Sequence, residues 1–216
     1  MKIPTSHPQL PWLFVLIASA GTLSAQPYLY VANQNSSTIS VVDTRNNSTV
    51  TNAITGFSPV GLAISPDGSR LFAANPNSNL VTVYSTANNQ LIANFPIGQA
   101  PMGLALDNTR LYVTLHGNAA LAVFNAATLG QQVTLRVGFG PCAVAVSSAN
   151  GRVYVANTYS STVSVVDPTR IGTPNNPVIG TITVPDSPIA LAISANGLNA
   201  WVLSSAMPML SRVNLE

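Results

Sequence analysis

The sequence has very little charge. Asp, Glu, Lys and Arg make up 6% of its 216 residues, and the only lysine, Lys2, stands near the N-terminus. Beyond it, seven arginines and six carboxylates are spread singly along the chain. A protein that binds nucleic acid through phosphates needs a basic face. The sequence shows no such cluster, so we expect no nucleic-acid partner.

Cysteine is almost absent. Cys142 is the only one, which excludes a disulfide within the chain even in an oxidising compartment. It stands in the run PCAVAV, which is typical of a buried strand. The sequence therefore predicts a structural thiol at Cys142 in place of a reactive one.

Long hydrophobic runs are also lacking. The only marked one is WLFVLIASA, residues 12–20, which follows Lys2 and precedes the small-residue stretch Leu23-Ser24-Ala25. This layout is typical of a secretory signal peptide over residues 1–25, with an uncleaved N-terminal anchor as the alternative. No later run approaches the roughly 20 apolar residues of a membrane span. We therefore expect residues 26–216 to be secreted, periplasmic or at the cell surface, with no stable membrane span after cleavage.

The chain shows no apolar pattern of helical period, but it repeats itself. YVANQNSSTISVVD, residues 30–43, returns as YVANTYSSTVSVVD, residues 154–167, with 11 of 14 positions identical. The aromatic that opens this segment recurs about every 40 to 47 residues, and so does a proline before a Gly/Ala-rich run. The recurring aromatics are Tyr30, Phe72, Tyr112, Tyr154 and Trp201. A constant period of this length predicts a repeat architecture.

Each period contains four short β-branched or aromatic runs separated by turn residues, which is the pattern of a four-stranded β-propeller blade. We name the strands A to D from the axis outward. The Gly/Ala-rich A strand, for example GLAI at 61–64, suits the crowded axis, and Asp67-Gly68, Asn150-Gly151 and Asn196-Gly197 predict hairpin turns after it.

The tally from residue 26 onward is four A, five B, five C and four D strands, or about four and a half blades. The sequence therefore predicts an all-β, partial or open propeller over residues 26–216. Three explanations remain open. The chain can be part of a longer propeller, its exposed faces can be covered by self-association or by blades of another chain, or an unusual ring can close on itself.

The repeat resembles a known one. The tetrads YVAN (30–33), FAAN (72–75), YVTL (112–115) and YVAN (154–157), with the SPDG turn at 65–68, are similar to the YVTN β-propeller repeat. The resemblance implies a surface-layer-like or extracytoplasmic propeller, a family whose members are commonly seven-bladed. Leu115 in place of Asn and WVLS at 201–204 depart from the pattern.

Loops that join strands B and C share one face of a propeller with the D-to-A loops, and they are rich here in amides and hydroxyls. We expect them to bind a protein or carbohydrate ligand in a non-catalytic module. The candidate binding residues are Asn33, Asn35, Asn75, Asn77, His116, Asn118, Asn157 and Tyr159. The alternative for Asn33, Asn75 and Asn157 is structural, because an Asn that ends a strand can bond the backbone two residues on and fix the turn.

The sequence supports no catalytic or metal-binding residues and implies no cofactor. His116 is the only histidine after residue 25, and it has no nearby partner of the kind that metal sites need. Asp43 and Asp167 end C strands where other repeats have Ser85 and Asn125, so turn capping explains them better than catalysis does.

An enzyme remains the alternative. Some propellers similar to the YVTN family are lactonases or cofactor-dependent oxidoreductases, and His116 with Arg110 or Arg136 could serve such a site. Residues 167–180 form the one clear insertion, in a C-to-D loop on the face opposite His116, where it is a possible contact site.

Overall fold

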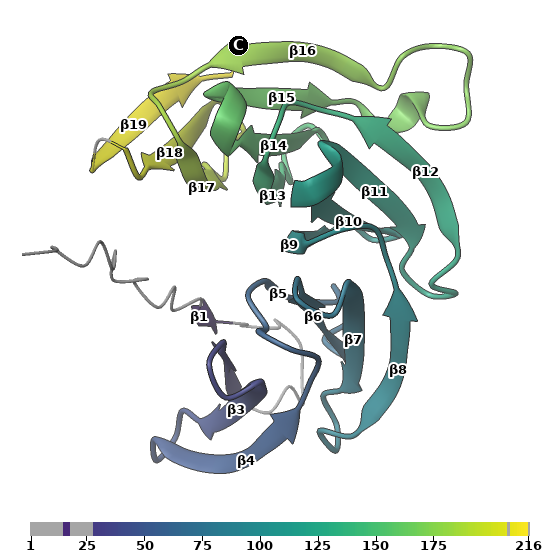
Figure 1. Cartoon of the computed structure of the whole chain (residues 1–216), viewed down its shortest axis with the longest axis vertical. Coiled ribbons are helices and arrows are strands. Elements are labelled where there is room, and N and C mark those ends of the chain that lie inside the picture. Colours follow the sequence, from purple (N-terminus) through teal and green to yellow (C-terminus); the bar gives the residue numbers. More distant parts are fainter. Residues whose placement is uncertain (1–14, 18–27, 207, 216) are drawn as a thin grey trace, which may run out of the picture.

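The computed structural model describes residues 15–17, 28–206 and 208–215. Within them, every regular element is a β-strand apart from three short 3₁₀ turns. The strands form five antiparallel sheets that stand around a common axis, and the arc they make is not closed (Figure 1). The predicted open propeller is therefore confirmed. No helix in this part of the chain is long and apolar enough to cross a membrane.

Each sheet is one blade, and its strands follow one another in chain order from the axis outward. Blade 1 has β1 (Val15–Ile17), β2 (Tyr28–Asn33), β3 (Thr38–Asp43) and β4 (Ser48–Ile54). Blade 2 has β5 (Leu62–Ile64), β6 (Arg70–Asn75), β7 (Leu80–Ser85) and β8 (Leu91–Pro96). Blade 3 has β9 (Pro101–Leu106), β10 (Arg110–Leu115), β11 (Ala120–Asn125) and β12 (Gln131–Arg136). Blade 4 has β13 (Pro141–Val146), β14 (Val153–Asn157), β15 (Thr162–Val166) and β16 (Val178–Thr183), and blade 5 has β17 (Pro188–Ile193), β18 (Asn199–Ser204) and β19 (Met209–Asn214).

Strands β2 to β19 confirm the predicted order of four A, five B, five C and four D strands among the described residues. Strand β1 is an additional inner strand, and it pairs antiparallel with β2. It falls within residues 1–25, whose role as a signal peptide stays a prediction. Removal of these residues would leave the inner edge of β2 without this partner.

The chain does not close its own ring. The last A strand, β17, pairs with β18 in its own blade and does not complete the first blade. Figure 1 shows the open side of the arc between the blade of β2–β4 and the blade of β17–β19. The closed-ring explanation is therefore wrong for this structure.

Burial of the B-strand aromatic holds the blades together. Tyr30, Phe72, Tyr112 and Tyr154 all lie in the core between one blade and the next, with at most 4% of each side chain exposed. Their equivalent settings confirm that the sequence repeat is a structural repeat. A blade covered on both faces buries both sides of its central strands, and the apolar residues therefore run without alternation over 71–74 in β6 and 153–156 in β14.

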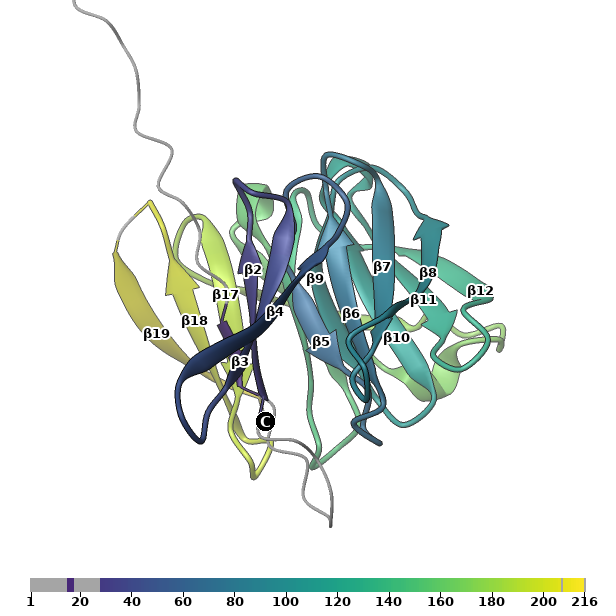
Figure 2. The ribbon, with the colours of Figure 1, turned by 90° about the horizontal axis from the view of Figure 1, so that it is seen from below.

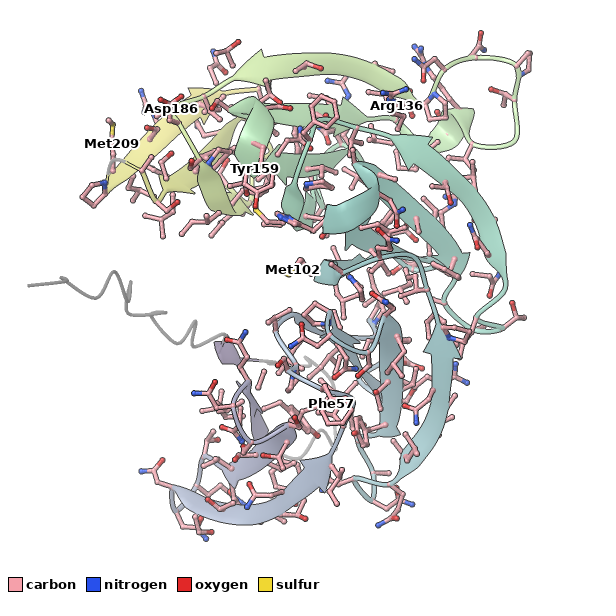
Figure 3. All side chains as sticks on the ribbon, in the orientation of Figure 1. Phe57, Met102, Arg136, Tyr159, Asp186 and Met209 are labelled. Atoms are coloured by element: carbon pink, nitrogen blue, oxygen red, sulfur yellow. The ribbon has the colours of Figure 1, made fainter. Side chains whose placement is uncertain are left out.

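The inner strands are crowded as predicted. A Cβ atom on Gly61 would lie 2.0 Å from the carbonyl oxygen of Met102 on the next blade, and one on Gly103 would lie 2.8 Å from that of Cys142. Met102 faces the inner side of the arc (Figure 3). Only glycine allows the inner backbones to approach this closely.

The A-to-B turns use their two residues differently. Gly68, Gly151 and Gly197 have φ near +70°, as their position in a tight turn demands. The residue before each of them has no positive φ. Its side chain instead accepts a backbone N–H two residues on, as Asp67 does from Ser69 at 3.0 Å.

Candidate functional site

The strand-ending asparagines are part of the blades. Each donates from its side-chain amide to a hydroxyl on the neighbouring C strand, seven residues on. The three bonds are Asn33 to Ser40 at 2.7 Å, Asn75 to Thr82 at 2.9 Å and Asn157 to Ser164 at 3.0 Å. The expected bond to the backbone two residues on is not the one they form. We call this unit the Asn–hydroxyl pair.

Burial separates these asparagines from the loop surface. Asn75 and Asn157 are fully buried, and Asn33 is half-buried. In the third repeat, Leu115 stands in place of Asn and Ala122 in place of the hydroxyl, so both members of the pair are lost together. A buried polar group needs its partner, which explains the joint replacement.

Three further candidates lie in the B-to-C loops themselves. The side-chain amide of Asn77 donates to Ser58 Oγ at 2.8 Å, and Asn118 Oδ1 accepts the N–H of Gln99 at 2.6 Å. Both bonds tie a B-to-C loop to a D-to-A loop, so the two loop types do share one face of the arc. Asn35 is exposed in the corresponding loop of blade 1. Figure 2 shows the strands running between two faces that carry the loops.

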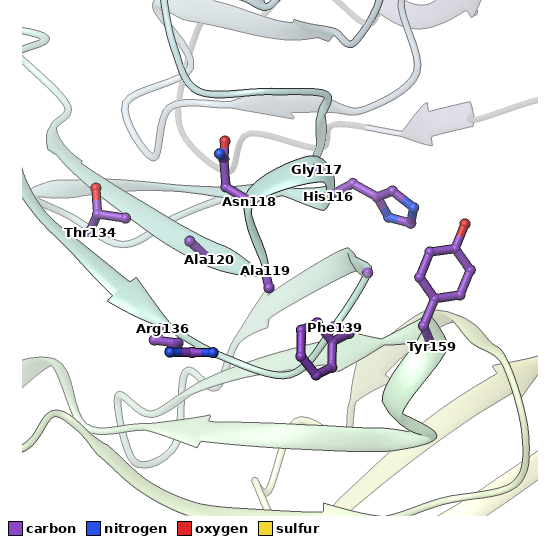
Figure 4. Close-up of a pocket in the computed structure, with 10 residues that line it drawn as sticks. His116, Gly117, Asn118, Ala119, Ala120, Thr134, Arg136, Phe139 and Tyr159 are labelled. Carbon is purple, nitrogen blue, oxygen red and sulfur yellow. The ribbon is translucent and has the colours of Figure 1, made fainter.

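The last two candidates, His116 and Tyr159, meet. They belong to two 3₁₀ turns, η1 (His116–Asn118) and η2 (Thr158–Ser160), at the same position of neighbouring blades. Their rings are 5.1 Å apart between centroids and meet edge to face (Figure 4). This geometry is favourable for a pair of aromatic rings.

The two rings border a pocket of about 720 Å³ between blades 3 and 4 (Figure 4). The lining is His116, Gly117, Asn118, Ala119, Ala120, Thr134, Arg136, Phe139, Gly140 and Tyr159. Phe139 and Tyr159 present their rings to solvent, with 62% and 73% exposed. Exposed aromatic rings beside a hollow mark a binding surface more often than an isolated apolar side chain does.

Gly140 makes room for this ring pair. Its φ is +64°, and a Cβ atom there would lie 2.7 Å from Tyr159 Cδ2 and 3.2 Å from His116 Cε1. The equivalent loop positions of other blades have a similar φ but carry a side chain, namely Ser58, Ala100 and Ser187. The glycine is therefore required by the two rings and not by the backbone alone.

The pocket is positive and lacks acid groups. Arg136 is the only charged residue of its lining, and it takes part in none of the ion pairs found among the described residues. Nδ1 of His116 is buried and has no hydrogen-bond partner within the described parts of the chain. Asn118 offers its side-chain NH₂ group as a further donor at the rim.

Most carboxylates of the described residues cap turns, and Asp186 instead accepts a hydrogen bond from Ser161. Asp43 and Asp167 accept the backbone N–H two residues on, at 2.9 and 3.0 Å, and Asn125 does the same at its equivalent position. Hydrogen bonds from Arg45 lower the pKa of Asp43, and the hydroxyl of Thr169 leads the lowering for Asp167. The predicted turn-capping role of these residues is confirmed.

The carboxylate of Asp107 is half-buried. Burial alone would raise its pKa, but hydrogen bonds from Tyr112, Thr109 and the Arg110 N–H outweigh that effect and lower the pKa. The same burial and the bond to Asp107 raise the pKa of Tyr112. Arg110 is held 3.9 Å from Asp107 and does not line the pocket. Of the two arginines considered for an enzyme, only Arg136 lies beside His116.

Two other sequence features lie elsewhere. Cys142 is half-buried on the axis side, where its Sγ lies 3.2 Å from the carbonyl oxygen of Pro188, and burial raises the pKa of its thiol. The insertion begins with a third turn, η3 (Pro168–Arg170), which Asp167 caps. Among the described residues, no group of three His, Cys, Asp or Glu side chains is arranged to hold a metal ion.

The sequence contained one signal for the pocket that was missed. The D-to-A loops read GFSP at residues 56–59 and GFGP at residues 138–141, and the Ser-to-Gly change marks the place where the ring pair lies. Phe139, Gly140 and Thr134 were not among the expected site residues. Their loop or strand is ordinary in sequence, and only the packing of two blades brings them to the pocket.

Comparison with known proteins supports the fold. Residues 18–95 match the family described as "Lactonase, 7-bladed beta-propeller". No curated protein matches the chain.

Three solved structures show the similarity in fold. The crystal structure of a functionally unknown protein from Desulfotomaculum acetoxidans aligns with a TM-score of 0.71 at 15% identity, over 89% of this chain and 68% of that one. A chain of the mitotic checkpoint complex aligns with a TM-score of 0.75 at 14% identity, over 87% and 59% of the two chains. The structure of U3-55K aligns with a TM-score of 0.74 at 17% identity, over 87% and 57%. The chain thus spans about three fifths of the last two.

Proposed function

We propose that this protein is a non-catalytic β-propeller module that binds carbohydrate in the pocket between blades 3 and 4. One observation carries the proposal. Two exposed aromatic rings, Phe139 and Tyr159, flank a hollow that also offers Arg136, His116 and Asn118. Of the remaining candidates, Asn33, Asn75, Asn77 and Asn157 are hydrogen-bonded within the blades or loops, and the exposed Asn35 does not line this pocket. The pocket itself combines aromatic surface with polar groups.

The chemistry of the pocket matches a sugar. A sugar ring has apolar C–H faces that can pack on an aromatic ring and hydroxyls that need polar partners at fixed positions. A volume of about 720 Å³ lies within the range of small-ligand pockets and holds a short glycan segment better than a protein surface. Because the only charged lining residue is Arg136, a sugar that carries a carboxylate gains a charge-assisted hydrogen bond that a neutral one lacks.

The proposed setting is outside the cytoplasm. The N-terminal pattern of Lys2, the apolar run at 12–20 and the small residues before position 26 supports export. The resemblance of the repeat to the YVTN type supports the same setting, at the cell surface or in the periplasm.

Binding of the purified chain to acidic and neutral glycans tests the proposal by titration calorimetry. We expect Tyr159→Ala to abolish binding. Arg136→Gln should lower the affinity for the acidic ligand by about tenfold, which is the effect of losing one charged hydrogen bond. Phe57→Ala is the matched control, because Phe57 occupies the position of Phe139 in another loop and is 70% exposed. Equal loss with Phe57→Ala, or no binding by the parent chain, contradicts the proposal.

A lactone hydrolase is the second candidate, and the family match over residues 18–95 favours it. His116 lies outside that segment, whereas Asp43 and Asp67 lie within it and are engaged in turns. A lactone-hydrolysis assay on the parent chain and on His116→Ala separates the candidates. Hydrolysis that disappears in the variant supports the enzyme and overturns the non-catalytic module.

A further inference from the structure

The last blade exposes an aromatic residue that every other blade buries. Tyr30, Phe72, Tyr112 and Tyr154 are at most 4% exposed, whereas Trp201, at the same position of blade 5, is 43% exposed. The difference has a direct cause. Each buried aromatic packs against the following blade, as Tyr154 packs with Ala200 and Val202, and no blade among the described residues follows Trp201.

Trp201 belongs to an apolar face of blade 5. Leu203 lies on the same side of β18, two residues on, and is 40% exposed. Leu210 and Arg212 of β19 stand directly opposite Leu203 and Trp201 and share that side of the sheet. We call these four residues the trailing face. Exposed Trp and Arg side chains are typical of the centre of a protein interface.

The first blade exposes the complementary surface. Leu29, Val31 and Asn33 of β2 share one side with Val42 and Ser40 of β3, and all five are half-buried. We call them the leading face. The five equivalent residues of blade 2 are Leu71, Ala73, Asn75, Tyr84 and Thr82, and each is at most 3% exposed because blade 1 covers them.

The two faces are the halves of one interface. Within the chain, the trailing side of one blade packs on the leading side of the next four times, from blade 1 to blade 5. The trailing face of blade 5 and the leading face of blade 1 have the same residue positions as these four pairs. In every internal contact, a trailing side packs against a leading side. Among the described residues, the leading face of blade 1 is not covered in this way.

We propose that a second copy of this protein packs head to tail on the first, with the trailing face of one copy on the leading face of the other. The contact continues the blade stacking of a single chain across two chains. It is heterologous, because two different surfaces meet, and its partners are therefore complementary and not self-complementary. The inference is independent of the carbohydrate pocket, which lies between blades 3 and 4.

Complementation between two variants tests the proposal. Trp201→Glu places a charge in the trailing face and Val31→Glu places one in the leading face. Leu91→Glu is the matched control, because Leu91 is 53% exposed on the outer strand β8, away from both faces. Light scattering and sedimentation of the full chain, over a wide range of concentration, measure association.

We expect the parent chain and Leu91→Glu to associate, and each end variant alone to be at least about thirtyfold weaker. Mixing the two end variants should restore association that stops at a pair, because one intact face of each kind remains. Trp201→Thr is a milder variant of the same position. If it also associates weakly while its circular dichroism spectrum is unchanged, the loss of association is not caused by a folding defect. A monomeric parent chain or a mixture that stays monomeric overturns the proposal. So does a Val31→Glu variant that pairs with itself, which indicates a symmetric contact.

Discussion

Replacement of Gly140 by serine tests the reasoning about the pocket most directly. Serine is the residue that two other D-to-A loops carry at this position, Ser58 and Ser187, with φ of 59° and 58°. The fold therefore accepts serine in this backbone conformation. What differs at Gly140 is the presence of the His116 and Tyr159 rings, so the substitution isolates the steric demand of those rings.

The magnitude follows from two contributions. A side chain in the left-handed region costs about 1–2 kcal/mol. The new Cβ would also lie 2.7 Å from Tyr159 Cδ2 and 3.0 Å from its Cγ, which forces the ring to move and costs about 1–3 kcal/mol by overpacking. We therefore expect Gly140→Ser to lower the free energy of unfolding by about 2–5 kcal/mol and to open the ring pair.

Urea denaturation measures this loss, and a double-mutant cycle assigns it. Tyr159→Ala removes both close atoms, so in the Gly140→Ser background it should recover the overpacking part of the loss. The matched control, Ser187→Gly, relieves the same backbone conformation away from the His116–Tyr159 ring pair and should change stability by no more than about 1 kcal/mol. A Gly140→Ser chain as stable as the parent, or a loss that Tyr159→Ala does not reduce, would refute the reasoning.

Three further predictions concern the blades. Asn75→Leu leaves the hydroxyls of Thr82 and Thr55 without their amide partner, so we expect urea denaturation to show a loss of about 2 kcal/mol in the free energy of unfolding. Adding Thr82→Ala should restore part of this loss, because the third repeat carries the same Leu and Ala combination. Burial and the nearby Tyr28 phenol raise the pKa of Tyr30 to about 12. Because the folded state holds this proton more tightly than the unfolded state, stability should fall as pH rises from about 10 to 12. Thermal denaturation across this pH range should show a smaller fall in stability for Tyr30→Phe. Hydrogen bonds from the Ser65 hydroxyl and the Ser69 N–H lower the pKa of Asp67 to about 2. The contribution of this carboxylate to stability is therefore present above about pH 4 and lost as pH falls toward 2. Acid denaturation of Asp67→Asn should show a smaller loss of stability over this range.

The strand pattern was readable because it is local. A strand such as β14 is recognised by its β-branched and aromatic residues, and its ends are recognised by turn residues within a few positions. The repeat strengthened this pattern, and the predicted tally of strands from residue 26 onward matches β2 to β19. The crowding of the A strands was also readable, because Gly61 and Gly103 recur where two backbones approach.

The roles of individual polar residues were less readable. Asn75 and Asn157 look like loop residues in sequence, yet both are buried and bonded to the next strand. Their partners lie seven residues on, and this spacing becomes a contact only when the hairpin forms. Joint loss of the pair at Leu115 and Ala122 was the one trace of it in the sequence.

The sequence by itself determined the repeat unit, its four strands and their order, because strand propensity and turn chemistry act over a few residues. Only the tertiary structure decided which loop residues form a site. His116 and Tyr159 belong to equivalent 3₁₀ turns of neighbouring blades, and they meet because blade stacking brings these two turns side by side. The same stacking decided that four equivalent aromatics are buried and that Trp201 is not, since burial depends on whether another blade stands beside it.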